Sequence, residues 1–233
     1  MYYKVLFMSK QNRVRPDPGG RLETLQEISD IKRIMERSSR FISLSGLSGI
    51  AAGLCALTGA YFAKNSLNEY YVEYNHGVGY TDKNFESLKF ELLAVAGIVL
   101  VAALILSFIF TWRRAKQNHL PVWDLTARKL MWNMLIPLIT GGLFILALLQ
   151  HNEWRFIAPA CLIFYGLGLV NGSKYTLTDI RYLGYLEIVL GLTNTQFTGY
   201  GLYFWAVGFG ILHIIYGALM WWKYEKSPVR PKG

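Results

Sequence analysis

Long apolar stretches separated by short polar segments are the main pattern along this chain. About 20 apolar residues are enough for a helix to cross a bilayer. Stretches of this kind occupy residues 41–63, 90–112, 130–150, 156–173, 177–197 and 200–222. The pattern therefore predicts an all-α integral membrane protein, a bundle of six transmembrane helices over residues 41–222.

The first stretch carries small residues at a regular spacing. Ser45, Gly49 and Gly53 recur every four residues, which places them on one face of a helix. Small residues at this spacing allow two membrane helices to approach closely. We expect this face to be a helix-packing surface.

A second periodic pattern precedes the first stretch. Its apolar residues recur every three or four positions with charges between them, as in an amphipathic helix. These residues are Leu22, Leu25, Ile28, Ile31, Ile34 and Met35. Residues 1–40 are thus predicted to be a cytoplasmic leader and an interfacial helix, and residues 223–233 a cytoplasmic tail. Two interpretations of the helix remain open: it lies along the membrane or the bundle, or it docks a protein partner or a second copy.

The polar segment between the first two stretches is the longest predicted external segment. Residues 64–89 include Tyr70, Tyr71, Tyr74 and Tyr80 around a His76-Gly77 turn. Tyrosine is common at membrane interfaces, so this segment is interpreted as a cap at the lipid edge.

Composition and charge agree with a membrane protein. The chain is 53% hydrophobic and 17% charged, with a net charge of +9. Twenty of the 24 Lys and Arg residues lie in four segments, 1–40, 113–129, 174–181 and 223–233. This bias follows the positive-inside rule and predicts that both termini are cytoplasmic. The expected partner of the basic segments is the lipid bilayer, and no nucleic-acid partner is predicted.

The chain lacks the sequence motifs of common enzyme sites. Cys55 and Cys161 both fall within apolar stretches, where they are expected to pack as small residues. Neither a metal-ligand spacing nor a phosphate-binding glycine motif is present. We therefore predict no metal, no cofactor and no enzymatic activity.

Two ionisable residues deep in the predicted spans form the best candidate site. Charged groups inside a bilayer are costly and tend to face the protein interior. Glu187 and His213 both lie roughly 14 Å from the cytoplasmic ends of their spans, at about 1.5 Å per residue. Each has glycines on the same helix face, so we expect the two side chains to face each other or share a water. Tyr165 and Asn171 are further candidates near that depth.

Two roles are open for Glu187 and His213. They could form a structural hydrogen bond between helices, or a proton-coupled or ligand-binding site. A carboxyl group beside an imidazole could exchange protons near neutral pH, as a proton relay or sensor requires.

The segment Gly46-Leu47-Ser48-Gly49, with a histidine in the last stretch, resembles the serine and histidine motifs of rhomboid intramembrane proteases. In that family the serine lies on the fourth core helix, whereas Ser48 lies on the first. The family's His and Asn motif in the second span is also missing here. We therefore interpret this segment as a packing surface.

Two other segments, IMERSSRFISLSGLSG and YTLTDIRYLGYLEIVLGL, resemble a family of uncharacterised six-span bacterial membrane proteins. The resemblance implies the six-helix fold and a bacterial inner membrane, but no activity and no functional residues. The expected function is a membrane accessory or signalling protein that acts through helix contacts, as a homo-oligomer or with a membrane or cytoplasmic protein partner. The alternative is a small proton-linked transporter or sensor, and a third possibility is an intramembrane enzyme without a recognisable motif.

Overall fold

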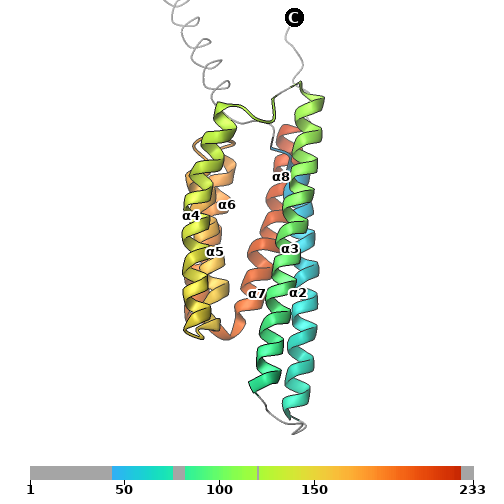
Figure 1. Cartoon of the computed structure of the whole chain (residues 1–233). Helices are drawn as coiled ribbons and strands as arrows, with labels where there is room; N and C mark the ends of the chain where they lie inside the picture. Colours follow the sequence, from blue (N-terminus) through green and yellow to red (C-terminus); the bar gives the residue numbers. More distant parts are fainter. Residues whose placement is uncertain (1–43, 76–81, 120, 227–233) are drawn as a thin grey trace, which may run out of the picture. The chain divides into compact units, whose positions relative to one another are not determined.

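The structure, a computed structural model, describes residues 44–75, 82–119 and 121–226 (Figure 1). This part of the chain is helical and contains no strand. The main helices are α2 (Gly46–Asn75), α3 (Asp82–Gln117), α4 (Leu125–Gln150), α5 (Ile157–Gly172) and α6 (Asp179–Gln196). The last pass is α7 (Gly201–Trp205), a π-helical segment η3 (Ala206–Leu212) and α8 (His213–Tyr224). The short turns η1 (Trp154–Phe156) and η2 (Thr198–Tyr200) precede α5 and α7.

Among the described residues, five helical segments are long and apolar enough to cross a membrane. They are Gly46–Val72, Phe85–Gln117, Leu125–Gln150, Trp154–Gly172 and Thr198–Tyr224. Helix α6 is not among them, because its 18 residues include Asp179, Arg181 and Glu187. The prediction of an all-helical fold is confirmed for the described residues. A spanning role for α6 stays a prediction, and the amphipathic helix predicted at residues 22–35 lies outside the described part.

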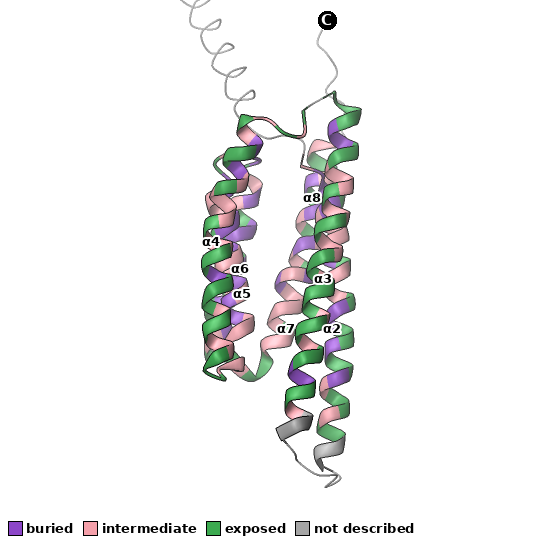
Figure 2. Ribbon diagram, in the orientation of Figure 1, coloured by how far each residue is buried: buried purple, intermediate pink, exposed green. Residues whose placement is uncertain are grey.

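The side chains are distributed as expected for a membrane protein. Large apolar residues on α3 and α4 are exposed, for example Ile98 (68%), Leu104 (61%) and Leu143 (63%). Figure 2 shows that exposed positions recur along both helices. Polar residues such as Glu187 and Asn194 are instead fully buried. Apolar exteriors of this size suit a hydrocarbon solvent.

The polar segment at residues 64–89 is largely helical, so the predicted limits of the first two stretches, residues 63 and 90, are wrong. Helix α2 continues to Asn75 and α3 already begins at Asp82. Polar residues here pair across the two helices: the hydroxyl of Ser66 donates to Glu91 at 2.7 Å. The rings of Tyr70 and Phe85 also pack, 6.1 Å apart. The polarity marks a contact between two extended helices, and the role of this segment as a cap at the lipid edge stays a prediction.

Glycines allow the closest helix contacts. A Cβ atom on Gly166 of α5 would lie 2.6 Å from the carbonyl oxygen of Gly184 on α6. On α2, a Cβ at Gly53 would lie 2.7 Å from the carbonyl oxygen of Gly210, and one at Gly49 would lie 3.2 Å from the Cα of Gly217. The small-residue face of the first span is therefore covered by the last pass of the same chain.

The start of α2 and the ends of α3 and α8 meet at one end of the bundle. Arg114 and Glu225 form an ion pair there, with Nη1 and Oε1 3.0 Å apart. The same Glu225 oxygen accepts from the Gly46 amide at 2.6 Å and the Ser45 hydroxyl at 3.2 Å. Arg114 also donates to the carbonyl of Leu44. We call these residues the Arg114 cluster.

The start of α6 is held by α8. Helix α6 begins at Asp179, one residue after Thr178. The Asp179 carboxylate accepts from Lys223 and from the Tyr224 hydroxyl, both at 2.8 Å. These two partners come from a distant helix, so sequence spacing alone does not reveal them.

Candidate functional site

Glu187 lies on the buried face of α6, between α5 and η3. Gly184, Gly191 and Asn194 share this face and are buried as well. The Glu187 side chain has no exposed surface. A Cβ atom on Gly208 of η3 would lie 2.5 Å from Oε2 of Glu187, so only glycine leaves room for the carboxyl group.

His213 begins α8, directly after the π-helical segment. Its Nδ1 lies 2.9 Å from the Gly208 carbonyl oxygen, five residues back. A carbonyl oxygen can only accept, so Nδ1 carries the hydrogen. In the neutral imidazole Nε2 is then an acceptor, and the Tyr165 hydroxyl lies 2.7 Å from it. Segments of π-helix are often found at functional sites, and here one places a backbone carbonyl against a side chain.

The structure brings Glu187 and His213 together. Oε1 of Glu187 lies 3.5 Å from Nδ1 of His213. Neither carboxyl oxygen has a hydrogen-bond partner among the residues that the structure describes. A buried polar group without a partner costs free energy, and a charged one costs more. We call Glu187, His213, Tyr165 and Gly208 the Glu187 cluster.

Aromatic rings enclose the histidine. The Phe209 ring stacks on His213 with centroids 5.9 Å apart and planes at 21°. Tyr165 packs against both Phe209, at 5.0 Å, and His213, at 5.3 Å. Trp205, one turn before Phe209, lies 5.2 Å from it. The rings restrict His213 to the orientation in which both nitrogens are bonded.

Asn194 is a buried polar residue that the sequence analysis missed. Its side chain has no exposed surface, and its Nδ2 donates to the Phe197 carbonyl at 3.0 Å. Its Oδ1 has no hydrogen-bond partner in the described part of the chain. The signal was available: Asn194 follows Glu187 by seven residues, two helical turns, and so lies on the same face.

Asn171 is not part of the Glu187 cluster. Its Nδ2 donates to the Asn133 carbonyl of α4 at 2.8 Å, and its Oδ1 accepts from Lys174 at 3.1 Å. It follows Tyr165 by six residues, which turns its side chain away from the Tyr165 face of α5. Asn171 and Tyr165 are predicted at similar depth in the membrane, but the structure does not bring them into one site.

Ser48 of the protease-like segment and His213 of the last pass each bond other groups. The Ser48 hydroxyl donates to the Ser45 carbonyl. Both nitrogens of His213 are engaged, by Gly208 and by Tyr165. Within the described residues, no group of three or more His, Cys, Asp or Glu side chains is placed to hold a metal ion.

Comparison with known proteins adds no relative: no protein-family model, curated protein or solved structure matches this chain. The resemblance of its two segments to a six-span bacterial family therefore stays a prediction.

Proposed function

We propose that this chain is a multi-pass membrane protein with a proton-linked function, a small transporter or a sensor, in which Glu187 gains and loses the proton. One observation carries the proposal: a fully buried carboxyl group lies 3.5 Å from an imidazole nitrogen, and neither of its oxygens is hydrogen-bonded within the described residues. A carboxyl group that served only to join two helices would have donors on its oxygens.

The proposed mechanism uses the difference between the two forms of the carboxyl group. The neutral acid tolerates the enclosed position between Gly208 and His213. Loss of the proton leaves a buried charge that requires donors or water. His213 can supply one donor only by giving up its bond to the Gly208 carbonyl, which belongs to the π-helical segment. Proton release is thereby linked to a rearrangement of η3 against α6.

We further propose that both termini are cytoplasmic and that the membrane is a bacterial inner membrane. The ends of α3 and α8 lie together and carry Arg113, Arg114, Lys116 and Lys223, in agreement with the positive-inside rule. The bacterial location depends on the resemblance of the two sequence segments.

The accessory or signalling role receives less support. Its cytoplasmic helix at residues 22–35 lies outside the described residues. The glycines of the small-residue surface that it would use, Gly49 and Gly53, are packed against α8 and η3 of the same chain.

Infrared difference spectroscopy of the full-length protein in lipid bilayers tests the proposal. Stepping the buffer from acidic to alkaline should remove the band of a protonated, non-hydrogen-bonded carboxyl group. Glu187→Gln should abolish this change, because an amide does not titrate. Glu153→Gln is the matched control, since Glu153 pairs with Arg155 at the surface and is 40% exposed. A titrating band that survives Glu187→Gln would overturn the proposal.

Proteoliposomes with an internal pH dye separate the two versions of the function. A transporter carries protons across the bilayer, and this flux should be lost in Glu187→Gln and kept in Glu153→Gln. A sensor shows the infrared change without flux.

A further inference from the structure

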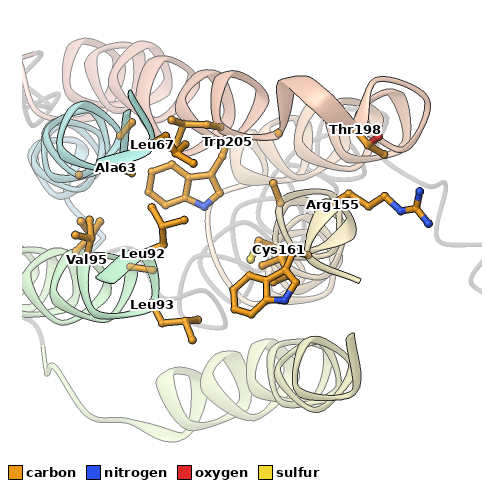
Figure 3. A pocket seen from close by; sticks show the side chains of 18 of the residues that line it. Ala63, Leu67, Leu92, Leu93, Val95, Arg155, Cys161, Thr198 and Trp205 are labelled. Atoms are coloured by element: carbon orange, nitrogen blue, oxygen red, sulfur yellow. The ribbon is translucent and has the colours of Figure 1, made fainter. Parts of the chain in front are cut away.

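A second feature of the bundle, separate from the Glu187 cluster, is a cavity in its side (Figure 3). It has a volume of about 440 Å³ and is lined by α2, α3, η1, α5, η2 and α7. We call it the side cavity. Its lining includes Ala63, Leu92, Ala96, Cys161 and Trp205. Neither Glu187 nor His213 lines it, so the inference below does not depend on the proton-linked function.

The side cavity is open to the outside of the bundle and suits an apolar occupant. Its volume lies within the range of small-molecule pockets, roughly 300–1,000 Å³. An apolar group gains more from this lining than water does, because the lining offers few polar partners to water. The lining is mainly apolar, with small residues where bulkier ones would close the space.

The position of the cavity indicates what fills it. Its lining reaches the outside of the bundle, where Leu93 is 43% and Tyr71 57% exposed. Leu93 belongs to α3 and Tyr71 to α2, and the outer surface of α3 is apolar and faces hydrocarbon in a membrane. The occupant that reaches the cavity from that side is a lipid acyl chain.

One end of the side cavity carries groups suited to a lipid head. Trp154, Arg155 and Thr198 lie in or next to the turns η1 and η2, at the end of the helices. Trp and Arg at such positions are typical of the bilayer interface. In Figure 3 the guanidinium of Arg155 points away from Trp205 and the apolar part of the lining. Its Nε donates to Glu153 at 3.0 Å.

We propose that the side cavity binds one acyl chain of a membrane phospholipid, with the phosphate beside Arg155 and the hydrocarbon along α3 and α5. The lipid completes the packing between the α2–α3 pair and α5. The site differs from an ordinary lipid-facing helix surface, because its apolar lining ends at a cationic side chain, Arg155.

The two cysteines of the chain provide a direct test. Cys161 lines the side cavity, whereas Cys55 lines an open apolar groove between α2 and α3 that has no charged lining residue. Full-length Cys55→Ala and Cys161→Ala, each with one cysteine, are treated with N-ethylmaleimide in detergent while phosphatidylglycerol is added. At lipid tenfold above its dissociation constant, alkylation of Cys161 should slow about tenfold. The alkylation rate of Cys55 should change gradually with lipid concentration and should not saturate.

A cavity-filling variant gives a second measurement. Ala96→Phe on α3 should fill the side cavity and remove the lipid-dependent rise in melting temperature. Ala94→Phe is the matched control, because Ala94 is equally exposed on the same helix and lines neither cavity. A lipid effect unchanged in Ala96→Phe, or equal behaviour of the two cysteines, would overturn the proposal. Protection that follows protein concentration at a fixed lipid ratio would overturn it as well, since a second copy would then be the occupant.

Discussion

The Arg114 cluster and the Glu187 cluster are two buried acid–base pairs with opposite hydrogen bonding. Arg114 and Glu225 are 10% and 16% exposed. Besides each other, they bond the Ser45 hydroxyl, the Gly46 amide and the Leu44 carbonyl. His213 and Glu187 are 8% and 0% exposed, yet both Glu187 oxygens lack a hydrogen bond within the described residues. A fully bonded pair fixes its helices in place. A pair whose carboxyl oxygens accept no hydrogen bond can change its bonding. We therefore assign a structural role to the Arg114 cluster and a functional one to the Glu187 cluster.

Removing the arginine of the bonded pair should have the largest effect. Arg114→Met keeps much of the apolar stem but leaves Glu225 buried without its cation. The free energy of unfolding should fall by about 3 kcal/mol, as for other broken buried pairs. Titration with a denaturing detergent in bicelles measures it. Glu153→Gln is the control: its pair with Arg155 is 40% and 61% exposed. Its loss should cost less than about 1 kcal/mol. Equal losses of unfolding free energy in the two variants would show that Arg114 has no special structural role.

The same substitution in both clusters tests the comparison directly. Glu225→Gln weakens charge-assisted bonds to Arg114 and Gly46 and should cost about 2 kcal/mol. Glu187→Gln breaks no hydrogen bond seen in the structure and should cost less than about 1 kcal/mol. Parallel unfolding titrations of the two variants provide the measurement. A larger loss for Glu187→Gln would mean that its carboxyl group stabilises the fold and that the two clusters are alike.

Within the Glu187 cluster, Tyr165→Phe should have a moderate effect. The variant removes the donor to Nε2 of His213 and leaves this buried nitrogen without a partner. We expect a loss of about 1 kcal/mol and a shift of the Nε2 resonance in nitrogen NMR of histidine-labelled protein. Tyr203→Phe is the control, because Tyr203 is 56% exposed. An unshifted resonance would show that the hydroxyl does not hold the imidazole.

The sequence was sufficient to predict a helical membrane bundle and the candidate pair, because both depend on local patterns. Glycines around Glu187 and His213 mark close helix approach, and similar depth on two helices brings the side chains to one level. The Arg114 cluster could not be predicted in this way. Arg114 looked like part of a basic loop, and its partners come from residues 44–46 and 224–225, at opposite ends of the chain.

The polar ends of the helices were the other difficulty. Asn194 lies inside the predicted span 177–197 and is not among the predicted site residues, although it shares a helix face with Glu187. Residues 64–89 are predicted to lie outside the first two spans, although hydrogen bonds and ring contacts keep most of this segment helical. Hydropathy indicates the environment in which a residue type is found on average. A buried polar contact depends instead on a partner elsewhere in the chain.

Asn171→Ala should have the smallest effect and tests whether depth alone defines the site. Asn171 bonds the Asn133 carbonyl and Lys174, away from both clusters. Its loss should cost about 0.5–1 kcal/mol, the net contribution of a typical hydrogen bond. The infrared titration of Glu187 should be unchanged, because no described contact joins Asn171 to that carboxyl group. If Asn171→Ala altered this titration, the proton-linked site would extend along α5 toward α4, and the present boundary of the Glu187 cluster would be wrong.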